Sequence, residues 1–510
     1  ATGTEYEFTL DMTKPVIKIT YDNNDALNGN YYKADRVATV VITEHNLDPN
    51  GVDKERINIT VTATDDGKEI TAPVETKWTT NGNTHTATIT YNADGPYNFD
   101  ITVKDKAGNE SLDYTAETFY VDKTNPAVSI TEIVDQSANN DEGDIGFVIT
   151  ATDTNFDSFA PVLTVTDITG ANKKLEVGTI GDITNGKTFT VKNLDADGIY
   201  RITCTVVDKA GNAFSEVTLQ RADGSTYVEN RDGDDTLVTF SVNRDGSTYE
   251  INANTADLIK KYYVQNVTDN VVIVETNADP LTEYKVTLNG QELTKDTDYT
   301  VTEEGGNGSW MKYTYSINKE LFADEGEYKI VVSSKDKATN DAFSDVKDAT
   351  VNFVVDRTAP IVTITCLAND GRYQTDVQTV TLIPTDDGGA LKSLIVRTVD
   401  EDGKQLKEIL NLSGEELEKA LADGAGKITF KNEKGLYQNV QIICDDCAVD
   451  KDGKTNVYDE TIKNVSVDAN AFIVNFWANK PLRWGSIAGV ILLAAAIILF
   501  VFFKKRKKEE

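Results

Sequence analysis

Acidic and amide side chains recur in a fixed order at three places in the chain, each after a run rich in β-branched residues. The shared pattern is an acid, any residue, Asn, any residue and Asp, at residues 44–48, 153–157 and 275–279. Carboxylate and amide oxygens are the ligands that calcium and other hard cations prefer. The pattern favours cation binding, but Asn and Asp also form tight turns by bonding nearby backbone, which needs no cation.

Residues suited to catalysis are scarce. The only histidines are His45 and His85, and Thr154 and Thr276 replace His45 in the other copies of its pattern. The sequence has no nucleophile elbow, metalloprotease helix, phosphate-binding loop or dinucleotide fingerprint. We therefore expect a protein that is not an enzyme.

A repeated strand must position the acids. The phrase Tyr97–Asn109, YNFDITVKDKAGN, returns at Tyr200–Asn212 and Tyr328–Asn340, and a diverged copy begins at Tyr437. Each copy reads as a turn, a strand and a second turn. The Asp residues that stand eight positions after the Tyr are Asp105, Asp208, Asp336 and Asp445.

A second phrase marks the seams between repeats. FTLDMTKP begins at Phe8, FYVDKTNP at Phe119 and FVVDRTAP at Phe353, with decayed copies at Phe240 and Phe472. It reads as a last strand, an Asp or Asn and a linker stiffened by Pro. Residues 1–13 are then the last strand of a preceding module that is missing. The complete modules 1 to 4 are predicted at residues 14–124, 125–244, 245–358 and 359–476.

Within each module the strand signals are short and alternating. Thr, Val, Ile and Tyr dominate runs such as Val37–Thr43, and Asn, Asp and Gly fill the turns. Six or seven such strands predict an antiparallel β-sandwich, so the fold class is all-β. Two exceptions predict helices, at Thr255–Val264 and at Ser413–Leu421, where Ser413 and Glu416 form a capping box.

The Tyr of each repeated strand resembles the tyrosine corner of immunoglobulin-like (Ig-like) folds, in which a Tyr near the start of strand F bonds back to earlier backbone. The four candidates are Tyr97, Tyr200, Tyr328 and Tyr437. With DKAGN before a terminal strand and VDxTxP into the next module, residues 1–476 resemble the tandem bacterial Ig-like (Big-type) repeats of Gram-positive cell-surface proteins and long adhesins. The resemblance implies four tandem Ig-like antiparallel β-sandwiches in a rod.

In an Ig-like sandwich, the loops after strands B and F lie at the end where the chain enters. The linker Asp, the acid-x-Asn-x-Asp pattern and the Asp and Asn of DKAGN are therefore expected to meet there. In some long adhesins of this kind calcium stiffens the junctions, so the resemblance implies calcium where the chain enters modules 1 and 2 and, with Asn243 in the linker, module 3. The candidate ligands are Asp11, Glu44, Asn46, Asp48 and Asp105 for module 1, and Asp122, Asp153, Asn155, Asp157, Asp208 and Asn212 for module 2.

Composition limits the partners. Lys plus Arg number 50 and Asp plus Glu 83, for a net charge of −33. Such a surface repels nucleic acid and favours cations and solubility. Four cysteines do not make a disulfide framework. Cys366, Cys444 and Cys447 leave room for one bridge in module 4, and a single CxxC is a weak redox or zinc signal, so we expect reduced thiols.

The C-terminal segment has the composition of a membrane anchor. Residues 485–503 carry no charge and are long enough to cross a bilayer as a transmembrane helix. The basic tail at residues 504–510 is then cytoplasmic and residues 1–484 lie outside, by the positive-inside rule. Because an outside N-terminus needs a signal peptide and none is present, we expect a mature product or a C-terminal piece.

These features predict a non-catalytic extracellular stalk or adhesin segment of a Gram-positive surface protein, anchored in the cell membrane by one helix. Four modules of ~30 Å give a rod on the order of 120 Å, which projects an N-terminal domain or mediates adhesion. The alternative is the Ig-like appendage of a surface glycan-degrading enzyme whose catalytic domain lies upstream. Host or cell-wall glycans and proteins are candidate partners. The aromatic residues that stack on sugars or pack inside the sandwiches are Trp78, Trp310, Tyr262 and Tyr263.

Overall fold

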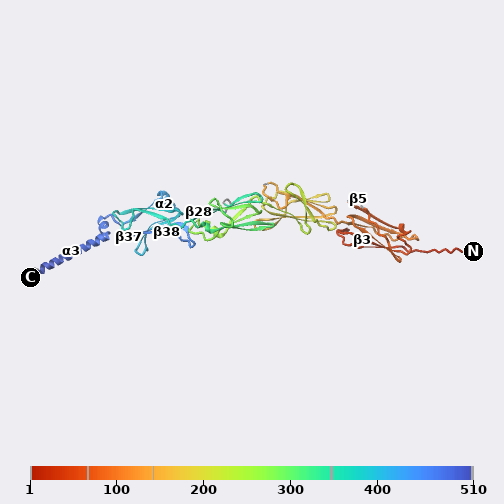
Figure 1. Ribbon diagram of the computed structural model, residues 1–510, viewed down its shortest axis with the longest axis horizontal. Helices are drawn as coiled ribbons and strands as arrows, with labels where there is room; N and C mark the ends of the chain where they lie inside the picture. Colours follow the sequence, from red (N-terminus) through yellow and green to blue (C-terminus); the bar gives the residue numbers. More distant parts are fainter. Residues whose placement is uncertain (1–2, 66–67, 70, 142, 345–348, 507–510) are drawn as a thin grey trace.

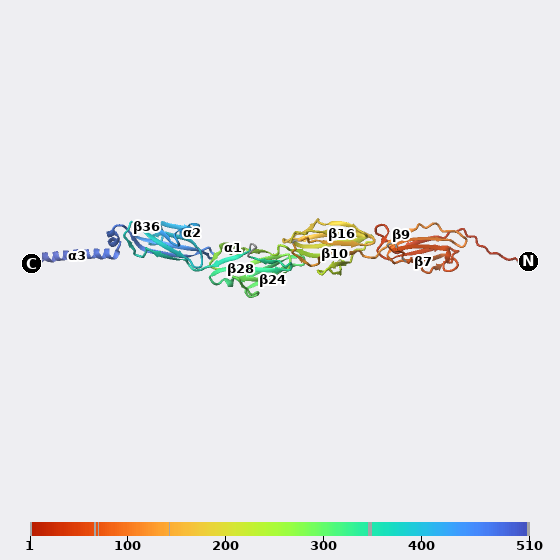
Figure 2. The same cartoon turned by 90° about the horizontal axis from the view of Figure 1, so that it is seen from above.

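The computed structural model describes residues 3–65, 68–69, 71–141, 143–344 and 349–506. The described chain forms an elongated molecule in which β-sandwiches follow one another in line, with the termini at opposite ends (Figure 1, Figure 2). Within it, separate clusters of buried apolar side chains span residues 32–121, 128–242, 249–355 and 362–467. This confirms the all-β fold of tandem Ig-like sandwiches. We call the sandwiches modules 1 to 4, and junction n is the end at which the chain enters module n.

Module 1 shows the alternation that the sequence predicts. Its strands are β1 (Val16–Tyr21), β2 (Tyr31–Tyr32), β3 (Arg36–Thr43), β4 (Ile57–Asp65), β5 (Lys68–Glu69), β6 (Thr79–Asn81), β7 (Thr84–Tyr91), β8 (Gly95–Val103) and β9 (Glu117–Val121). One sheet has the order β1-β3-β7-β6 and the other β2-β9-β8-β4-β5, and the 3₁₀ turn η1 (Lys54–Arg56) precedes β4. Every second residue of β3 and β8 is buried because successive side chains point to opposite faces. The ring of Tyr97 stacks on Phe119 between the sheets, with centroids 5.6 Å apart.

Module 2 repeats this plan with longer central strands. Its strands are β10 (Ala127–Val134), β11 (Ala138–Asn139), β12 (Phe147–Thr152), β13 (Phe156–Thr166), β14 (Asn172–Leu175), β15 (Thr179–Ile183), β16 (Gly186–Val191), β17 (Gly198–Asp208), β18 (Glu216–Gln220), β19 (Thr226–Asn230) and β20 (Thr236–Val242). The sheets have the orders β15-β16-β12-β10-β18-β19 and β11-β20-β17-β13-β14. The core again includes a stacked pair, Tyr200 on Phe240 at 5.2 Å.

Module 3 adds a helix to the sandwich. Its elements are β21 (Thr248–Ile251), α1 (Ala253–Lys261), β22 (Tyr263–Val264), β23 (Val271–Asn277), β24 (Leu281–Leu288), β25 (Gln291–Glu292), β26 (Tyr299–Gly306), β27 (Ser309–Ile317), the 3₁₀ turn η2 (Lys319–Phe322), β28 (Gly326–Asp336), β29 (Asp341–Phe343) and β30 (Val351–Val355). The side chain of Asn252 accepts from the backbone N–H of Thr255 and so caps α1. The predicted helix therefore exists, but it begins and ends earlier in the chain.

Module 4 shares backbone pairing with module 3. Its elements are β31 (Ile361–Thr365), β32 (Arg372–Tyr373), β33 (Val377–Thr385), β34 (Leu391–Val399), β35 (Gln405–Ser413), α2 (Gly414–Asp423), β36 (Ile428–Glu433), β37 (Gly435–Val449) and β38 (Thr455–Val467). The order β25-β24-β28-β30-β22-β37-β34-β35 carries one sheet across the junction, and β31-β33-β36 forms the facing sheet. Ser413 stands at the N-cap of α2, but its side chain makes no capping hydrogen bond, so the predicted capping box is absent.

The two ends of the described chain differ. Residues 3–15 form no strand there, and the side chains of Tyr6, Phe8, Leu10 and Met12 are between 79% and 89% exposed. At the other end, the π-helical turn η3 (Ile473–Trp477) leads into α3 (Lys480–Arg506), none of whose residues is buried. α3 is long and apolar enough to cross a membrane.

The seam phrase predicted at Phe472 is wrong, because those residues turn into η3. The last strand of module 4 is β38, and it ends in Val465-Ser466-Val467 followed by Asp468. This matches the end of β9 followed by Asp122, with Val465 in place of the usual Phe. The apolar residues from Phe472 onward therefore belong to the connection with α3.

Candidate functional site

The DKAGN turn is built by reciprocal bonds between its first and last residues. In module 2 the backbone N–H of Asp208 donates to the carbonyl of Asn212 at 3.1 Å, and the N–H of Asn212 donates to Asp208 Oδ1 at 2.8 Å. Gly211 has a φ of +84°, which explains why Gly precedes the Asn. Module 3 has Thr339 at this position with a φ of +71°, a conformation that a β-branched residue rarely adopts.

The linker Asp joins this turn at the junctions of modules 1, 2 and 4. One oxygen of its carboxylate accepts from the backbone N–H of the Thr two residues later, at 2.8–3.1 Å, which is an Asx-turn. The pairs are Asp11 with Thr13, Asp122 with Thr124 and Asp356 with Thr358. The turn bonds expected of Asp in tight loops are therefore present.

At these junctions carboxylates from three separate segments converge. Each group has one ligand oxygen per residue, and these oxygens lie within 4.8 Å of one another. The groups are Asp11, Glu44 and Asp105 at junction 1, Asp122, Asp153 and Asp208 at junction 2, and Asp356, Asp386 and Asp446 at junction 4. Six of the eleven residues predicted at junctions 1 and 2 belong to these groups, and the other five, two acids and three amides, lie elsewhere or make other contacts.

Asp48 and Asp157, the last acids of their patterns, do not join the groups. Both are exposed, and Asp48 lies against the turn at Gly51. Asp157 follows the first residue of β13, beside a register shift between Phe156 and Ser158. Because side chains alternate along an extended segment, residues two apart can still be separated where the backbone bends.

The predicted amide ligands donate rather than accept toward the carboxylates. The side-chain nitrogen of Asn46 donates to Asp11 at 2.6 Å, and that of Asn155 donates to Asp122 at 2.7 Å. The side-chain nitrogen of Asn212 donates to Asp208 at 2.6 Å. In this state these amides reduce the repulsion within each group, and their role as oxygen ligands of a cation stays a prediction.

Burial makes these groups electrostatically costly. Burial raises the pKa of Asp122 and raises that of Asp153 to about 6. Asp11 is more open, and its bond from Asn46 lowers the pKa of its carboxyl group. Within the described residues, none of the carboxylates in the three groups pairs with a lysine or arginine. A divalent cation would supply the charge that the protein does not.

Junction 4 was missed by the sequence analysis and has the least satisfied group. Asp356 is fully buried, and the described residues offer no hydrogen-bond partner to its Oδ2 or to either carboxylate oxygen of Asp386. A Cβ at Gly389 would lie 2.4 Å from Asp356 Oδ2, so only glycine leaves this space open. Burial raises the pKa of Asp356 and Asp386, and that of Asp446 to about 6.

A bulged strand explains why Asp446, and not Asp445, completes this group. The pairing of β37 with β38 shifts register between Gly435 and Gln438 and again before Val440. The shift inverts the faces, so Asp446 is fully buried and Asp445 accepts from Ser393 instead.

The same bulge removes one tyrosine corner. Tyr97, Tyr200 and Tyr328 donate to the carbonyl oxygens four residues earlier, at 2.7, 2.6 and 2.9 Å. Tyr437 has a φ of +55° and donates instead to the carbonyl of Trp477 at 2.7 Å. The prediction of a fourth corner is therefore wrong, and Tyr437 holds the connection to α3.

The acids of the pattern at residues 275–279 are not among the three carboxylate groups of the described residues. Glu275 is fully buried in module 3, where Tyr249, Tyr315 and Ser334 donate to its carboxylate. Asn277 and Asp279 remain at junction 3 and contact Asn243.

Other candidate groups have structural partners. His85 is buried, with Nε2 3.0 Å from the carbonyl of Glu44, and His45 contacts Asn83. Trp78 is buried in module 1, and Trp310 Nε1 donates to Thr166 of module 2 at 2.9 Å. The four cysteines are free thiols, and burial raises the pKa of Cys204 and Cys444 to about 12.

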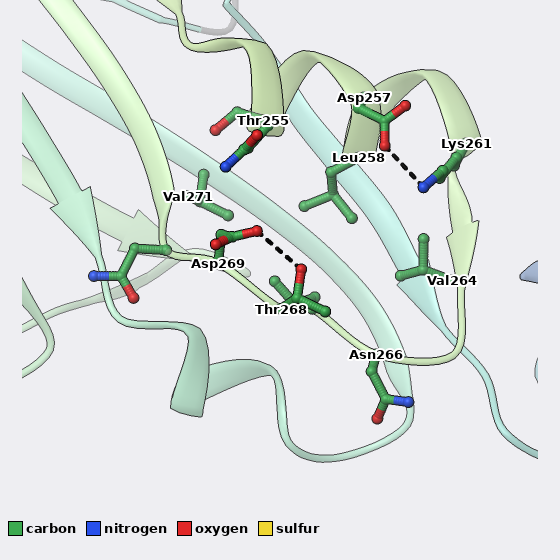
Figure 3. A pocket seen from close by; sticks show the side chains of 12 residues that line it. Thr255, Asp257, Leu258, Lys261, Val264, Asn266, Thr268, Asp269 and Val271 are labelled. Atoms are coloured by element: carbon green, nitrogen blue, oxygen red, sulfur yellow. Dashed lines mark hydrogen bonds and ion pairs between the residues drawn. The ribbon is translucent and has the colours of Figure 1, made fainter. Parts of the chain in front are cut away.

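A small cavity lies beneath α1. It measures about 100 Å³, and Leu258, Val264 and Val271 form its apolar part beside the Asp257–Lys261 ion pair (Figure 3). Pockets for substrate-sized ligands are about 300–1,000 Å³, so this cavity fits a few water molecules. A larger hollow of about 590 Å³ near the base of module 4 is lined mainly by polar side chains, including Lys431, Glu433 and Asn439.

Comparison with known proteins matches one part of the chain to a family. The family model of the bacterial Ig-like domain matches residues 49–123. Comparison with curated protein sequences finds no match. Similar solved structures include FdeC, an adhesin of Escherichia coli, with 14% identity, 67% of this chain and 97% of that chain covered, and a TM-score of 0.23.

Two further similar structures come from Ig-domain arrays. The complex of Dpr2 Ig1–Ig2 with DIP-Theta Ig1–Ig3 has 12% identity and a TM-score of 0.30, and the match covers 67% of this chain and 99% of that chain. The eight N-terminal Ig domains of Down Syndrome Cell Adhesion Molecule have 12% identity and a TM-score of 0.25, with 89% and 49% covered. Residues 49–123 therefore match the bacterial Ig-like domain, and the fold of the described chain is that of tandem Ig-like sandwiches.

Proposed function

We propose that this protein is a non-catalytic extracellular stalk or adhesin segment, held at the cell membrane by α3. The observation that carries the proposal is the direct connection of each sandwich to the next. Asn28 and Lys33 of module 1 donate to the carbonyls of Lys209 and Gly211 in module 2, at 2.9 and 3.0 Å. Such end-to-end contacts resist bending and suit a chain that holds its far end away from a surface.

The base of the rod supports attachment at a membrane. The ammonium group of Lys480 lies 4.6 Å from the ring of Tyr437, and the guanidinium of Arg483 lies 4.9 Å from Trp477 and 5.4 Å from Trp484. Cationic and amphipathic aromatic side chains beside an apolar helix suit a membrane–water interface. At the other end of the helix, Lys504, Lys505 and Arg506 favour the cytoplasmic side.

The orientation is tested by labelling with a membrane-impermeant maleimide. In cells that produce the full protein, exposed Cys366 is expected to react on intact cells, with Cys447→Ser as the background. The matched control is Lys505→Cys in a background that carries both Cys366→Ser and Cys447→Ser. The new thiol at position 505 is expected to react only after permeabilisation. Labelling of Cys366 only after permeabilisation would overturn the proposed orientation.

We propose further that divalent cations, calcium first, stabilise junctions 1, 2 and 4. Converging carboxylate oxygens, two of three on buried residues in each group and none paired with a cationic side chain of the described residues, are the donor set of a calcium site. The unpartnered Asp356 Oδ2 and the space beside Gly389 support this role most directly. The residues would hold the ion between the linker and two loops of the following module, which stiffens the junction.

The test measures calcium bound to the full chain in detergent micelles by equilibrium dialysis. Asp386→Asn is expected to reduce the bound calcium by one ion per chain, because it removes a charged ligand at junction 4. The control is Asp387→Asn, an exposed neighbour outside the group. Equal binding by wild type and Asp386→Asn would contradict a site at junction 4.

A further inference from the structure

Junction 3 differs from the other junctions in the residue that follows the last strand of the preceding module. Asn243 stands where Asp122 and Asp356 stand at junctions 2 and 4, and it is fully buried. Its linker lacks the Thr and Pro of the others. The backbone N–H groups of Arg244 and Asp245 both donate to Asp197 Oδ2 at 2.8 Å, an anchor to the preceding module that the linkers at junctions 2 and 4 also have. The linker is therefore held by module 2 itself.

The side-chain nitrogen of Asn243 lies at the centre of the junction. It is 2.9 Å from each of three oxygens, which belong to Asn277, Asp279 and Asp336. The surroundings determine the orientation of the amide, because the reverse orientation would place its oxygen against three acceptors. An N–H₂ group thus occupies the position where the linker Asp places a carboxylate at junctions 1, 2 and 4.

Neutral donors satisfy the remaining carboxylates of junction 3. Asp336 Oδ2 accepts from three amides, those of Asn243, Asn277 and Asn340, at 2.9, 3.0 and 3.0 Å. Asp279 Oδ1 accepts from Ser241 Oγ at 2.5 Å. The equivalent of Asp336 Oδ2 at junction 2 is Asp208 Oδ2, to which the described residues present one such donor, Asn212.

We propose that the side-chain amide of Asn243 takes the place of a divalent cation, so that junction 3 is closed without one. The inference rests on the proposed role of cations at the other junctions. It follows from charge: an amide there leaves two carboxylates in the group, whereas junctions 1, 2 and 4 each have three. Junction 3 then stays closed without a cation, whereas the carboxylate groups of junctions 1, 2 and 4 respond to the cation concentration.

Contacts outside the group make this joint firmer. Trp310 of module 3 donates to the carbonyl of Thr166 in module 2 at 2.9 Å. Lys337 Nζ donates to the carbonyl of Gln136 at 2.8 Å. Neither contact involves the carboxylate group, so modules 2 and 3 are expected to remain aligned when cations are removed.

Hydrogen exchange followed by mass spectrometry tests this on the full chain in detergent micelles, with calcium or with a chelator. Peptides covering residues 122–126 and 208–212 are expected to exchange about tenfold more slowly when free calcium is ten times its dissociation constant. Peptides covering residues 241–247 and 336–340 are expected to exchange equally in both conditions. If calcium slows exchange at junction 3 as well as at junction 2, the inference about Asn243 is wrong, while the proposed cation site at junction 2 stands.

A reciprocal pair of variants makes the test sharper. Asn243→Asp restores the third carboxylate and is expected to make junction 3 sensitive to the chelator and to add one bound calcium per chain. Asp122→Asn is expected to remove one calcium and the chelator sensitivity of junction 2. Asn172→Asp, an exposed change in β14, is the control for added charge. An Asn243→Asp variant that unfolds junction 3 with no response to calcium contradicts the inference, and no response at any junction of wild type overturns both proposals.

Discussion

The side-chain nitrogen of Asn212 lies 2.9 Å from the main-chain carbonyl oxygen of Asp122, and its N–H₂ group donates to that oxygen across junction 2. The same relationship recurs at every junction of the described chain. The other pairs are Asn109 with Asp11 at 3.1 Å, Asn340 with Asn243 at 2.7 Å and Asn456 with Asp356 at 3.2 Å. The last residue of the DKAGN turn in modules 1 to 3, and Asn456 of β38 in module 4, therefore hold the linker whether or not the linker side chain is acidic.

Replacing this Asn is expected to loosen the junction. In Asn212→Ala, the buried carbonyl of Asp122 and the carboxylate of Asp208 each lose a donor, which is worth about 1–3 kcal/mol for a buried group. Hydrogen exchange in residues 122–126 should therefore accelerate. Asn172→Ala, an exposed change in the same module, should leave exchange there unchanged. Equal behaviour of the two variants would contradict the role of Asn212.

The tyrosine corner is expected to stabilise module 2. Tyr200→Phe removes the hydroxyl that bonds the carbonyl of Ala196 but keeps the stacked ring. The free energy of unfolding of module 2 should fall by about 1 kcal/mol, measured from the exchange of its strands in urea. Tyr227→Phe is the matched control, because the hydroxyl of Tyr227 makes no hydrogen bond within the described residues, and its effect should stay within about 0.5 kcal/mol.

Glu275 is expected to matter for the core of module 3 rather than for cations. Glu275→Ala leaves the hydroxyls of Tyr249, Tyr315 and Ser334 without their acceptor, so the free energy of unfolding should fall by about 3 kcal/mol. Glu275→Gln keeps an acceptor oxygen and should cost about 1 kcal/mol. Calcium binding should be unchanged in both variants, and a lost calcium ion would show that this carboxylate belongs to a site.

The stability of the cation-free protein is expected to fall as the pH rises. The folded-state pKa values of Asp153 and Asp446 are raised to about 6, above the ordinary value of 3.8. The folded state therefore binds these protons more tightly than the unfolded state, and the advantage is lost between about pH 4 and pH 6. With a chelator, the melting temperature should be higher at pH 4.5 than at pH 7.5. The double variant Asp153→Asn, Asp446→Asn is the control, because it shows how much of the difference comes from other titrating groups.

Calcium should reverse this trend, because it binds the deprotonated carboxylates. Its effect on the melting temperature is expected to be large at pH 7.5 and small at pH 4.5, where protons compete for the same oxygens. Calorimetry in calcium and in chelator at both pH values checks this. An effect of calcium that is equal at both pH values would argue against binding at the carboxylate groups.

The sequence by itself determined the repeated architecture. Alternating residues such as those of Val37–Thr43 specify which face of a strand is buried, and this pattern acts over a few residues. The turn between Asp208 and Asn212 is equally local, because its own backbone and side chains close it. The apolar run of α3 is predicted to be a membrane-spanning helix from its length and composition alone, without knowledge of its tertiary contacts.

Only the tertiary structure decided which acids meet. Asp356, Asp386 and Asp446 come from three segments, and their distances depend on how the sheets pack. One bulge in β37 exchanged Asp445 for Asp446 and turned Tyr437 away, because a shift of one residue inverts the two faces of a strand. The same holds for Asn243, because the three oxygens that its amide contacts belong to residues up to 93 positions away in the chain. Short-range patterns fix local conformation. The chemistry of a junction depends on long-range packing, which the spacing of residues in the sequence does not measure.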